Sequence, residues 1–94
     1  MGRSIFVVAY DVSDDKRRNR ISRELLKYGV RAQYSVFEVF VSEKELKQMK
    51  KQLQKFIDRY EDSLVFYPLT ENEYKNAKRE GNKLSFGHLN DIYV

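Results

Sequence analysis

Residues 5–11 read Ile-Phe-Val-Val-Ala-Tyr-Asp, six apolar residues followed at once by one carboxylate. A short run rich in valine and aromatic residues is typical of a strand that is buried on both faces. We therefore expect Asp11 at the end of this strand, where the sheet meets water. A carboxylate fixed there is a suitable ligand for a hard cation such as Mg²⁺, which often takes only one or two protein ligands. A segment dense in arginine follows, so this part of the chain pairs a candidate cation site with a candidate polyanion site.

The chain of 94 residues is large enough for one domain over residues 1–94 with a modest core. Burial of further surface in a homodimer would help so small a domain. Charged residues make up 34% and hydrophobic residues 41% of the chain, which is typical of a globular protein. The net charge of +4 raises the expectation of nucleic acid as a partner only modestly.

The absence of cysteine excludes disulfides, thiolate nucleophiles and zinc-thiolate sites. No apolar stretch has the length of a signal peptide core or a membrane span, so we expect a cytoplasmic protein with no membrane partner.

The next segment predicts a helix and then strand structure. Ser13 is placed to cap a helix that runs to about Tyr28, where Gly29 supplies the stop. Residues 30–41 are rich in valine and aromatic residues, which predicts one long bent strand or two short strands joined by a turn near residues 35–38.

A second helix and a third strand region follow. Ser42 and Glu45 form a capping box, and apolar residues then keep helical spacing at Leu46, Met49, Leu53, Phe56, Ile57 and Tyr60. Residues 63–69 predict a strand, and Pro68 indicates that this strand stops or lies at an edge of the sheet.

The C-terminal part has two sections. Residues 71–83 are polar and are expected to form a tail, whereas residues 84–94 recover apolar side chains. A short last strand has no place in a compact four-stranded sheet, so we expect residues 84–94 to complete the sheet of a partner subunit. The order of elements predicts an α+β fold, a ferredoxin-like βαββαβ sandwich with two helices on one face of an antiparallel sheet, plus a C-terminal strand exchanged in a homodimer.

Asp11 has two alternative interpretations. It can simply begin a turn or cap the following helix. Alternatively, in a two-fold dimer with Asp11 near the axis, two copies of this carboxylate share one Mg²⁺ ion, which polarises a phosphodiester and activates water.

The basic residues are concentrated between Asp11 and Gln33. Arginine outnumbers lysine there, and its planar guanidinium suits bidentate phosphate contacts, so we assign this cluster to recognition and the lysines of the second helix mostly to solubility. A solvated helix face is the alternative for both sets. The first cluster contains Lys16, Arg17, Arg18, Arg20, Arg23, Lys27 and Arg31.

Strand alternation places Arg31, Gln33, Ser35 and Phe37 on one face, which suits a polar groove or a subunit interface. In the alternative interpretation Phe37 is a core residue and Ser35 marks a bend. His88, the only histidine, has no evident catalytic companion and is interpreted as structural. The chain contains neither a glycine-rich phosphate loop nor an aromatic RNA-recognition motif.

Two motifs carry a resemblance to a known family. They are Tyr10-Asp11-Val12-Ser13-Asp14-Asp15-Lys16-Arg17-Arg18 and Tyr28-Gly29-Val30-Arg31-Ala32-Gln33-Tyr34-Ser35-Val36-Phe37-Glu38. With both motifs at this separation, the chain resembles the small CRISPR-associated adaptation proteins, the second of the two universal adaptation proteins.

The resemblance implies a ferredoxin-like dimer in which about residues 91–94 complete the partner's sheet. It implies that Asp11 is the catalytic residue and the ligand of Mg²⁺, or of Mn²⁺ in its place, with one Asp11 from each subunit. It also implies a metal-dependent endonuclease that acts on single-stranded RNA or double-stranded DNA and joins a partner integrase in spacer acquisition. The resemblance also places further residues near the cleft between the two subunits, namely Tyr10, Arg18, Arg20, Arg31, Gln33, Ser35 and Phe37.

Two other functions compete with this one. The first is a non-catalytic DNA-binding bridge for the integrase, which would tolerate the loss of Asp11. The second is a toxin-like ribonuclease of the VapD kind, a family of similar fold.

Overall fold

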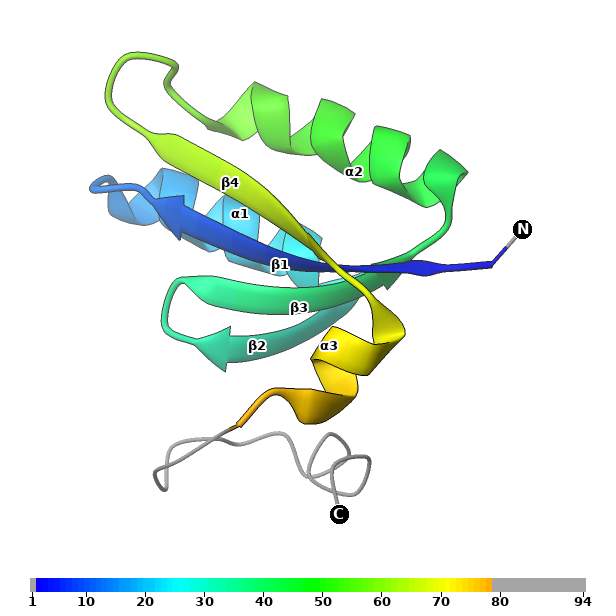
Figure 1. Cartoon of the computed structure of the whole chain (residues 1–94). Coiled ribbons are helices and arrows are strands. Elements are labelled where there is room, and N and C mark those ends of the chain that lie inside the picture. Colours follow the sequence, from blue (N-terminus) through cyan, green and yellow to red (C-terminus); the bar gives the residue numbers. More distant parts are fainter. Residues whose placement is uncertain (1, 79–94) are drawn as a thin grey trace.

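The computed structural model describes residues 2–78, in which four strands and three helices follow one another along the chain (Figure 1). The strands form one antiparallel sheet in the order β2-β3-β1-β4. The predicted α+β, ferredoxin-like order is confirmed, and β4 is an edge strand, as Pro68 indicated. The elements are β1 (Ser4–Asp11), α1 (Asp15–Leu26), β2 (Gly29–Gln33), β3 (Val36–Val41), α2 (Glu43–Phe56), β4 (Ser63–Leu69) and α3 (Glu71–Asn76).

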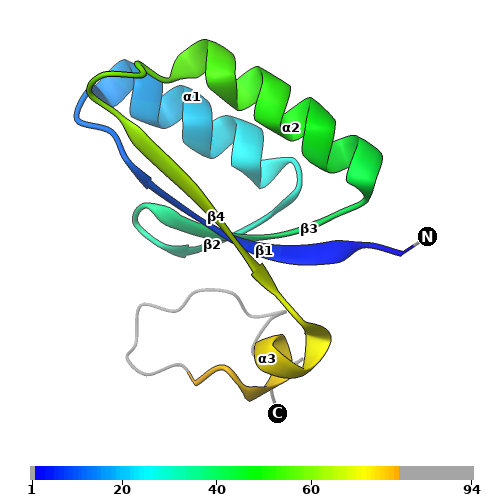
Figure 2. The ribbon, with the colours of Figure 1, turned by 45° about the horizontal axis from the view of Figure 1, so that its top comes forward.

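The two faces of the sheet are covered unequally. Helices α1 and α2 lie over one face, and α3 lies on the opposite side (Figure 2). On the helix-covered face Val8 is completely buried. On the opposite face Val65 and Tyr67 of β4 are 38% and 53% exposed. The prediction that the first strand is buried on both faces is correct only in part: on the second face Ile5 is buried, but Val7 and Ala9 are only half-buried, since antiparallel sheets commonly leave one face partly open.

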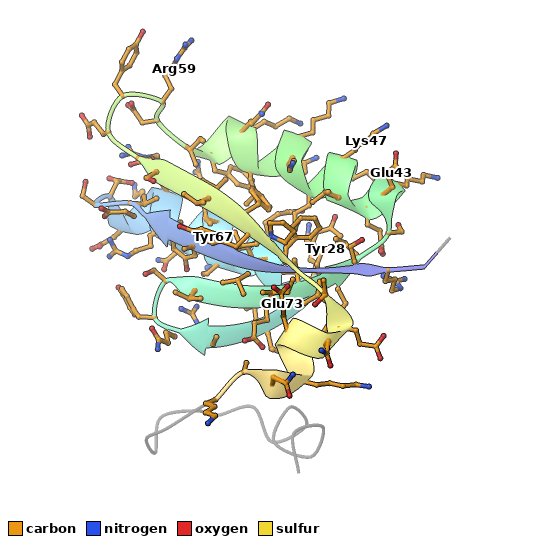
Figure 3. The ribbon with its side chains drawn as sticks, in the orientation of Figure 1. Tyr28, Glu43, Lys47, Arg59, Tyr67 and Glu73 are labelled. Atoms are coloured by element: carbon orange, nitrogen blue, oxygen red, sulfur yellow. The ribbon has the colours of Figure 1, made fainter. Side chains whose placement is uncertain are left out.

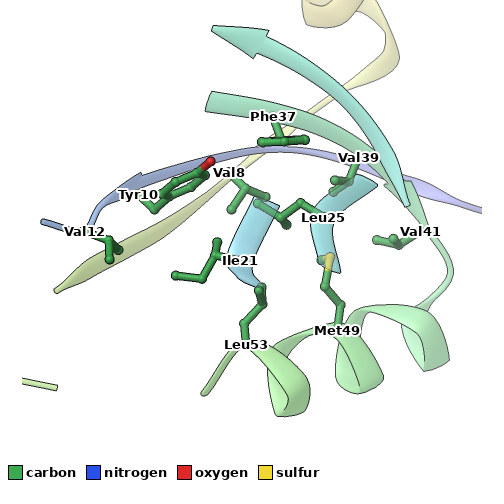
Figure 4. Close-up of a cluster of buried hydrophobic side chains, with 10 residues drawn as sticks. All are labelled: Val8, Tyr10, Val12, Ile21, Leu25, Phe37, Val39, Val41, Met49 and Leu53. Atoms are coloured by element: carbon green, nitrogen blue, oxygen red, sulfur yellow. The ribbon is translucent and has the colours of Figure 1, made fainter. Parts of the chain in front are cut away.

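The main core lies between the sheet and the pair of helices (Figure 4). The helical spacing read from the sequence places Leu53 and Met49 of α2 in this core, and both are fully buried. Val12, just beyond the end of β1, also belongs to it and so anchors the chain on the far side of Asp11. The ten buried members are Val8, Tyr10, Val12, Ile21, Leu25, Phe37, Val39, Val41, Met49 and Leu53.

A second, smaller cluster occupies part of the other face, where residues expected to form a polar tail instead form α3. The Thr70 hydroxyl accepts a hydrogen bond from the Glu73 amide (3.0 Å), and the Glu73 carboxylate accepts one from the Thr70 amide (2.8 Å). This capping box is the same signal that correctly predicted α2, so α3 was predictable from the sequence. Tyr74 is 3% exposed and packs edge to face against Phe40, with ring centroids 5.3 Å apart.

The boundaries of α1 differ from those predicted. Asp14 caps the helix in place of Ser13, because its carboxylate accepts a hydrogen bond from the Arg17 amide at 2.9 Å. The helix ends at Leu26, and Gly29 begins β2. Glycine is required there by close packing, since a Cβ atom on residue 29 would lie 1.9 Å from the Glu38 carbonyl oxygen.

The second of the two alternatives for residues 30–41 is correct, because a turn at Tyr34 and Ser35 separates β2 from β3. Helix α2 ends at Phe56, and Tyr60, predicted to continue its apolar face, is 88% exposed. The Asp58 carboxylate accepts hydrogen bonds from the amides of Tyr60 (2.8 Å) and Glu61 (3.2 Å), which turns the chain away from the helix axis.

The expected C-terminal strand at residues 84–94, including residues 91–94 and His88, lies outside the described residues. Within residues 2–78, every helix is too short and too polar to cross a membrane.

Candidate functional site

Asp11 is the last residue of β1 and lies opposite Ser63 of β4 in the sheet register. Its neighbours Tyr10 and Val12 are both 4% exposed and belong to the core, whereas Asp11 itself is exposed. Strand alternation therefore directs the Asp11 carboxylate away from the helices, toward the open face of the sheet. Anchored neighbours on both sides fix the position of this exposed carboxylate.

The neighbouring carboxylates are already engaged. Asp14 caps α1, Asp15 forms an ion pair with Arg18, and Asp62 forms one with Arg17. Across residues 2–78 the Asp11 carboxylate, by contrast, takes part in no hydrogen bond or ion pair. Because Asp14 performs the capping role, capping of α1 does not explain Asp11.

A metal site built by one copy would need more ligands. Residues 2–78 contain no group of three or more histidine, cysteine, aspartate or glutamate side chains that could hold a metal ion. Since Asp14, Asp15 and Asp62 are engaged elsewhere, Asp11 is the carboxylate that one chain has available at this position. This donor set fits Mg²⁺, which keeps several waters and takes one or two carboxylates.

Arg18 lies against the end of β1. Its Nη1 atom donates hydrogen bonds to the carbonyl oxygens of Val12 (2.8 Å) and Ser13 (3.1 Å), and its Cζ atom lies 5.7 Å from the centroid of the Tyr34 ring. Together with its ion pair to Asp15, these contacts hold the guanidinium against the backbone of Val12 and Ser13, which directly follows Asp11 in the chain. Arg18 is thus positioned by the backbone that carries the candidate ligand.

Arg31 and Tyr10 attach the turn between β2 and β3 to the end of β1. Arg31 donates a hydrogen bond to the Tyr34 carbonyl oxygen, which also accepts one from the Tyr10 hydroxyl at 3.4 Å. The Tyr10 amide donates to the Ser35 carbonyl oxygen at 3.0 Å. These bonds bring together four of the predicted site residues, namely Tyr10, Arg18, Arg31 and Ser35, around the turn.

Burial raises the pKa of the Tyr10 phenol, and the nearby Arg31 guanidinium opposes that rise. A tyrosine whose pKa is raised stays neutral at physiological pH. Tyr10 is therefore a hydrogen-bond donor in this site and is not suited to act as a base.

Phe37 is placed differently from the expectation that it lines a cleft. It pairs with Arg31 in the register of β2 and β3, so the two residues do share a face, but that face is the one covered by the helices. Phe37 is completely buried and stacks on Tyr10 with ring centroids 6.2 Å apart. The Arg31 Cζ atom lies over the Phe37 ring, 4.9 Å from its centroid. The alternative interpretation of Phe37 as a core residue is the correct one.

Arg17 has a different partner from Arg18 and Arg31. Its guanidinium donates to both Asp62 carboxylate oxygens, at 2.8 and 3.1 Å, and the Asp62 side chain is fully inaccessible to solvent. The hydrogen bond from Arg17 lowers the pKa of Asp62, with a further contribution from the Asp58 amide. Arg17 thus ties α1 to the segment before β4.

The remaining predicted positions are more peripheral. Arg20 is exposed on α1, and Gln33 is exposed at the end of β2. Tyr34, which is 70% exposed, was not among the candidates, although its carbonyl and ring hold the cluster together. An aromatic residue within a polar turn between two strands was the signal that could have identified it.

Comparisons with known proteins agree on one family. The sequence profile described as CRISPR associated protein Cas2 matches residues 4–77. The chain is 46% identical over 66 residues to CRISPR-associated endoribonuclease Cas2 3 of Synechocystis sp., covering 70% of this chain and 72% of that protein.

Solved structures show the same relationship. The crystal structure of Streptococcus pyogenes Cas2 at pH 6.5 matches with a TM-score of 0.76 and 33% identity, covering 82% of this chain and 99% of that one. A chain of a partial Cas6-RT-Cas1–Cas2 complex matches with a TM-score of 0.69 and 32% identity, covering 81% and 89% of the two chains.

Proposed function

Because the chain belongs to the CRISPR-associated Cas2 family, we propose that it takes part in CRISPR adaptation as a metal-dependent endonuclease. The observation that carries the enzymatic part is the position of Asp11, exposed at a strand end between two buried neighbours while the nearby acids are engaged elsewhere. Asp11 is the proposed ligand of Mg²⁺ or Mn²⁺. When bound, this ion polarises the phosphodiester and lowers the pKa of water.

A homodimer is part of the proposal, because one chain contributes only one carboxylate. The open face of the sheet supports association, since Val65 and Tyr67 expose apolar surface beside half-buried Val7 and Ala9. Asp11 lies at the end of this same face. A second copy seated there would bring its own Asp11 and complete a two-carboxylate site.

The roles of the arginines follow from their contacts. Arg18 and Arg31 are held by backbone carbonyl oxygens, so their guanidinium groups are positioned in advance to bind phosphate oxygens at the end of β1. They approach this end from the helix-covered side, whereas the Asp11 carboxylate faces the open side, so a substrate strand would pass around the end of β1 to reach both. Arg20, exposed further along α1, adds a phosphate contact outside this cluster. Arg17 acts mainly through Asp62, by holding the loop before β4.

RNA and DNA remain the two substrate classes of the proposal. The relative from Synechocystis is named an endoribonuclease, which supports single-stranded RNA. Cleavage of double-stranded DNA is the other activity to be tested, with the same role for Asp11.

Cleavage assays with single-stranded RNA and duplex DNA, in Mg²⁺, Mn²⁺ or EDTA, test this proposal. We expect Asp11→Ala to lower the cleavage rate by at least about a hundredfold, because loss even of a group that only orients a metal ligand costs about 10–100-fold, and EDTA to have the same effect. Glu61→Gln is the matched control, because it removes an exposed carboxylate from the same end of the sheet. Equal rates for wild type and Asp11→Ala would refute the enzymatic role.

A second function, a non-catalytic DNA-binding bridge for an integrase, is supported by the match to a chain from a complex that contains Cas1. It uses the arginine surfaces and not Asp11. Spacer acquisition by the Asp11→Ala protein separates the two functions: retained acquisition with lost cleavage assigns the adaptation role to the bridge. The family match over residues 4–77 favours both over the toxin-like ribonuclease.

A further inference from the structure

Two strongly exposed tyrosines stand at the Asp11 end of the sheet. Tyr34 (70% exposed) lies in the turn between β2 and β3, and Tyr60 (88% exposed) lies in the loop of residues 57–62 between α2 and β4. Tyr34 and Tyr60 have no packing role in the core clusters. Neither ring is needed to fill the core, so both are available to contact a ligand.

Each tyrosine has an arginine against one face of its ring. The Cζ atom of Arg18 lies 5.7 Å from the Tyr34 centroid, and that of Arg59 lies 5.6 Å from the Tyr60 centroid. Figure 3 shows Arg59 at the tip of its loop, projecting away from the sheet. With a guanidinium on one side and high overall exposure, each ring presents its other face to solvent.

Both rings are carried by backbone that is fixed by hydrogen bonds. The Tyr34 carbonyl oxygen accepts from Arg31 and Tyr10. The Tyr60 amide donates to the Asp58 carboxylate, and the same loop is held by the Arg17–Asp62 pair. A rigid platform loses little conformational entropy when a ligand stacks on it.

The two platforms flank Asp11. Strand β1, which ends at Asp11, lies between β3 and β4 in the sheet. On one side the Tyr10 amide donates to the Ser35 carbonyl oxygen, next to Tyr34, and on the other side Asp11 pairs with Ser63, the residue that follows the loop of Tyr60. Aromatic rings with nearby cations are the usual means of binding unpaired bases, because every base has a π face.

We propose that Tyr34 and Tyr60 are base-stacking residues that bind an unpaired nucleic-acid segment, one on each side of the strand end that carries Asp11. This inference rests on the proposed nucleic-acid function and adds to it a preference for single strands, RNA or DNA. Paired bases in a duplex are stacked on each other and cannot use the two rings.

Binding measurements in EDTA test the inference, since cleavage cannot then intervene. The probes are a fluorescent oligouridylate, a fluorescent oligothymidylate and a hairpin duplex of similar charge. We expect Tyr34→Leu and Tyr60→Leu each to weaken single-strand binding roughly tenfold, within the range that one stacked base contributes. The matched Phe variants should bind like wild type, and duplex affinity should be unchanged in all four.

Three results would overturn the inference: Leu variants that bind single strands like wild type, equal losses in the Phe and Leu variants, or equal losses for the duplex. Failure of the wild-type protein to bind either single strand would also overturn it. A cleavage activity that survives Asp11→Ala would refute the proposed catalytic role without affecting these binding results. A loss confined to oligouridylate or to oligothymidylate would identify the strand that the tyrosines hold.

Discussion

Replacement of Phe37 tests whether this residue belongs to the core or to an open cleft. The side chain is completely buried and contacts both the Tyr10 ring and the Arg31 guanidinium. Phe→Ala in a core costs about 3–5 kcal/mol, which includes the cavity that remains. Loss of the Arg31 contact over the ring adds about 0.5–1 kcal/mol. We therefore expect Phe37→Ala to lower the free energy of unfolding by about 4 kcal/mol, a large fraction of the roughly 5–14 kcal/mol available to a domain of this size.

Urea denaturation followed by circular dichroism measures this loss, at one fixed protein concentration because association contributes to stability. Phe37→Leu keeps most of the volume and should cost only about 1–2 kcal/mol, so it remains measurable where the alanine variant does not fold. Gln33→Ala, an exposed change on the adjacent strand, should stay within about 0.5 kcal/mol of wild type. A loss below about 1 kcal/mol for Phe37→Ala would refute the assignment of Phe37 to the core.

Three further predictions concern other parts of the fold. Gly29→Ala forces a Cβ atom against the Glu38 carbonyl oxygen, so the backbones of β2 and β3 must separate. We expect the free energy of unfolding to fall by more than about 3 kcal/mol. Chemical denaturation measures this loss, and stability near that of wild type would contradict it. The lowered pKa of Asp62 means that its ion pair stabilises the folded state above the unfolded pKa near 4 and is lost as pH falls through the folded pKa. The stability difference between wild type and Asp62→Asn should therefore be largest above about pH 5 and should shrink as the pH is lowered through the acid range; a constant difference would contradict this. Thr70→Ala removes the cap of α3 and should cost about 1 kcal/mol, with faster amide exchange at residues 71–76 and no change in α2; unchanged exchange would show that the cap is dispensable.

Much of the fold was predictable because local signals and burial agree. The apolar run of β1, the Ser42 and Glu45 capping box and the spacing of Met49 and Leu53 all lead to the observed elements. Errors occur where a local signal has two meanings. The sequence predicts that Gly29 ends the first helix, but its role is to let β2 approach β3 closely, and that distance depends on the tertiary structure.

The candidate site was predictable in part, for a related reason. Alternation correctly put Arg31 and Phe37 on one face, but it could not say which face the helices cover, and Phe37 lies in the core as a result. Likewise, the sequence places Arg17 and Arg18 side by side, whereas only the fold brings Asp62, 45 residues away, to Arg17. Partners distant in the sequence decide which arginines are available for a substrate.

Because each chain carries one Asp11, cleavage by a site shared between two chains should depend on the protein concentration. If two copies of Asp11 hold the ion together, a separated subunit has half of the ligands, and the specific activity should fall on dilution through the dimer dissociation range. The arginine surfaces are complete within each chain, so nucleic-acid binding should decline less steeply over the same range. Mixing wild type with Asp11→Ala protein sharpens the test, because subunit exchange should then produce mixed dimers that lack one carboxylate. A specific activity that is independent of both dilution and mixing would show that each Asp11 works alone.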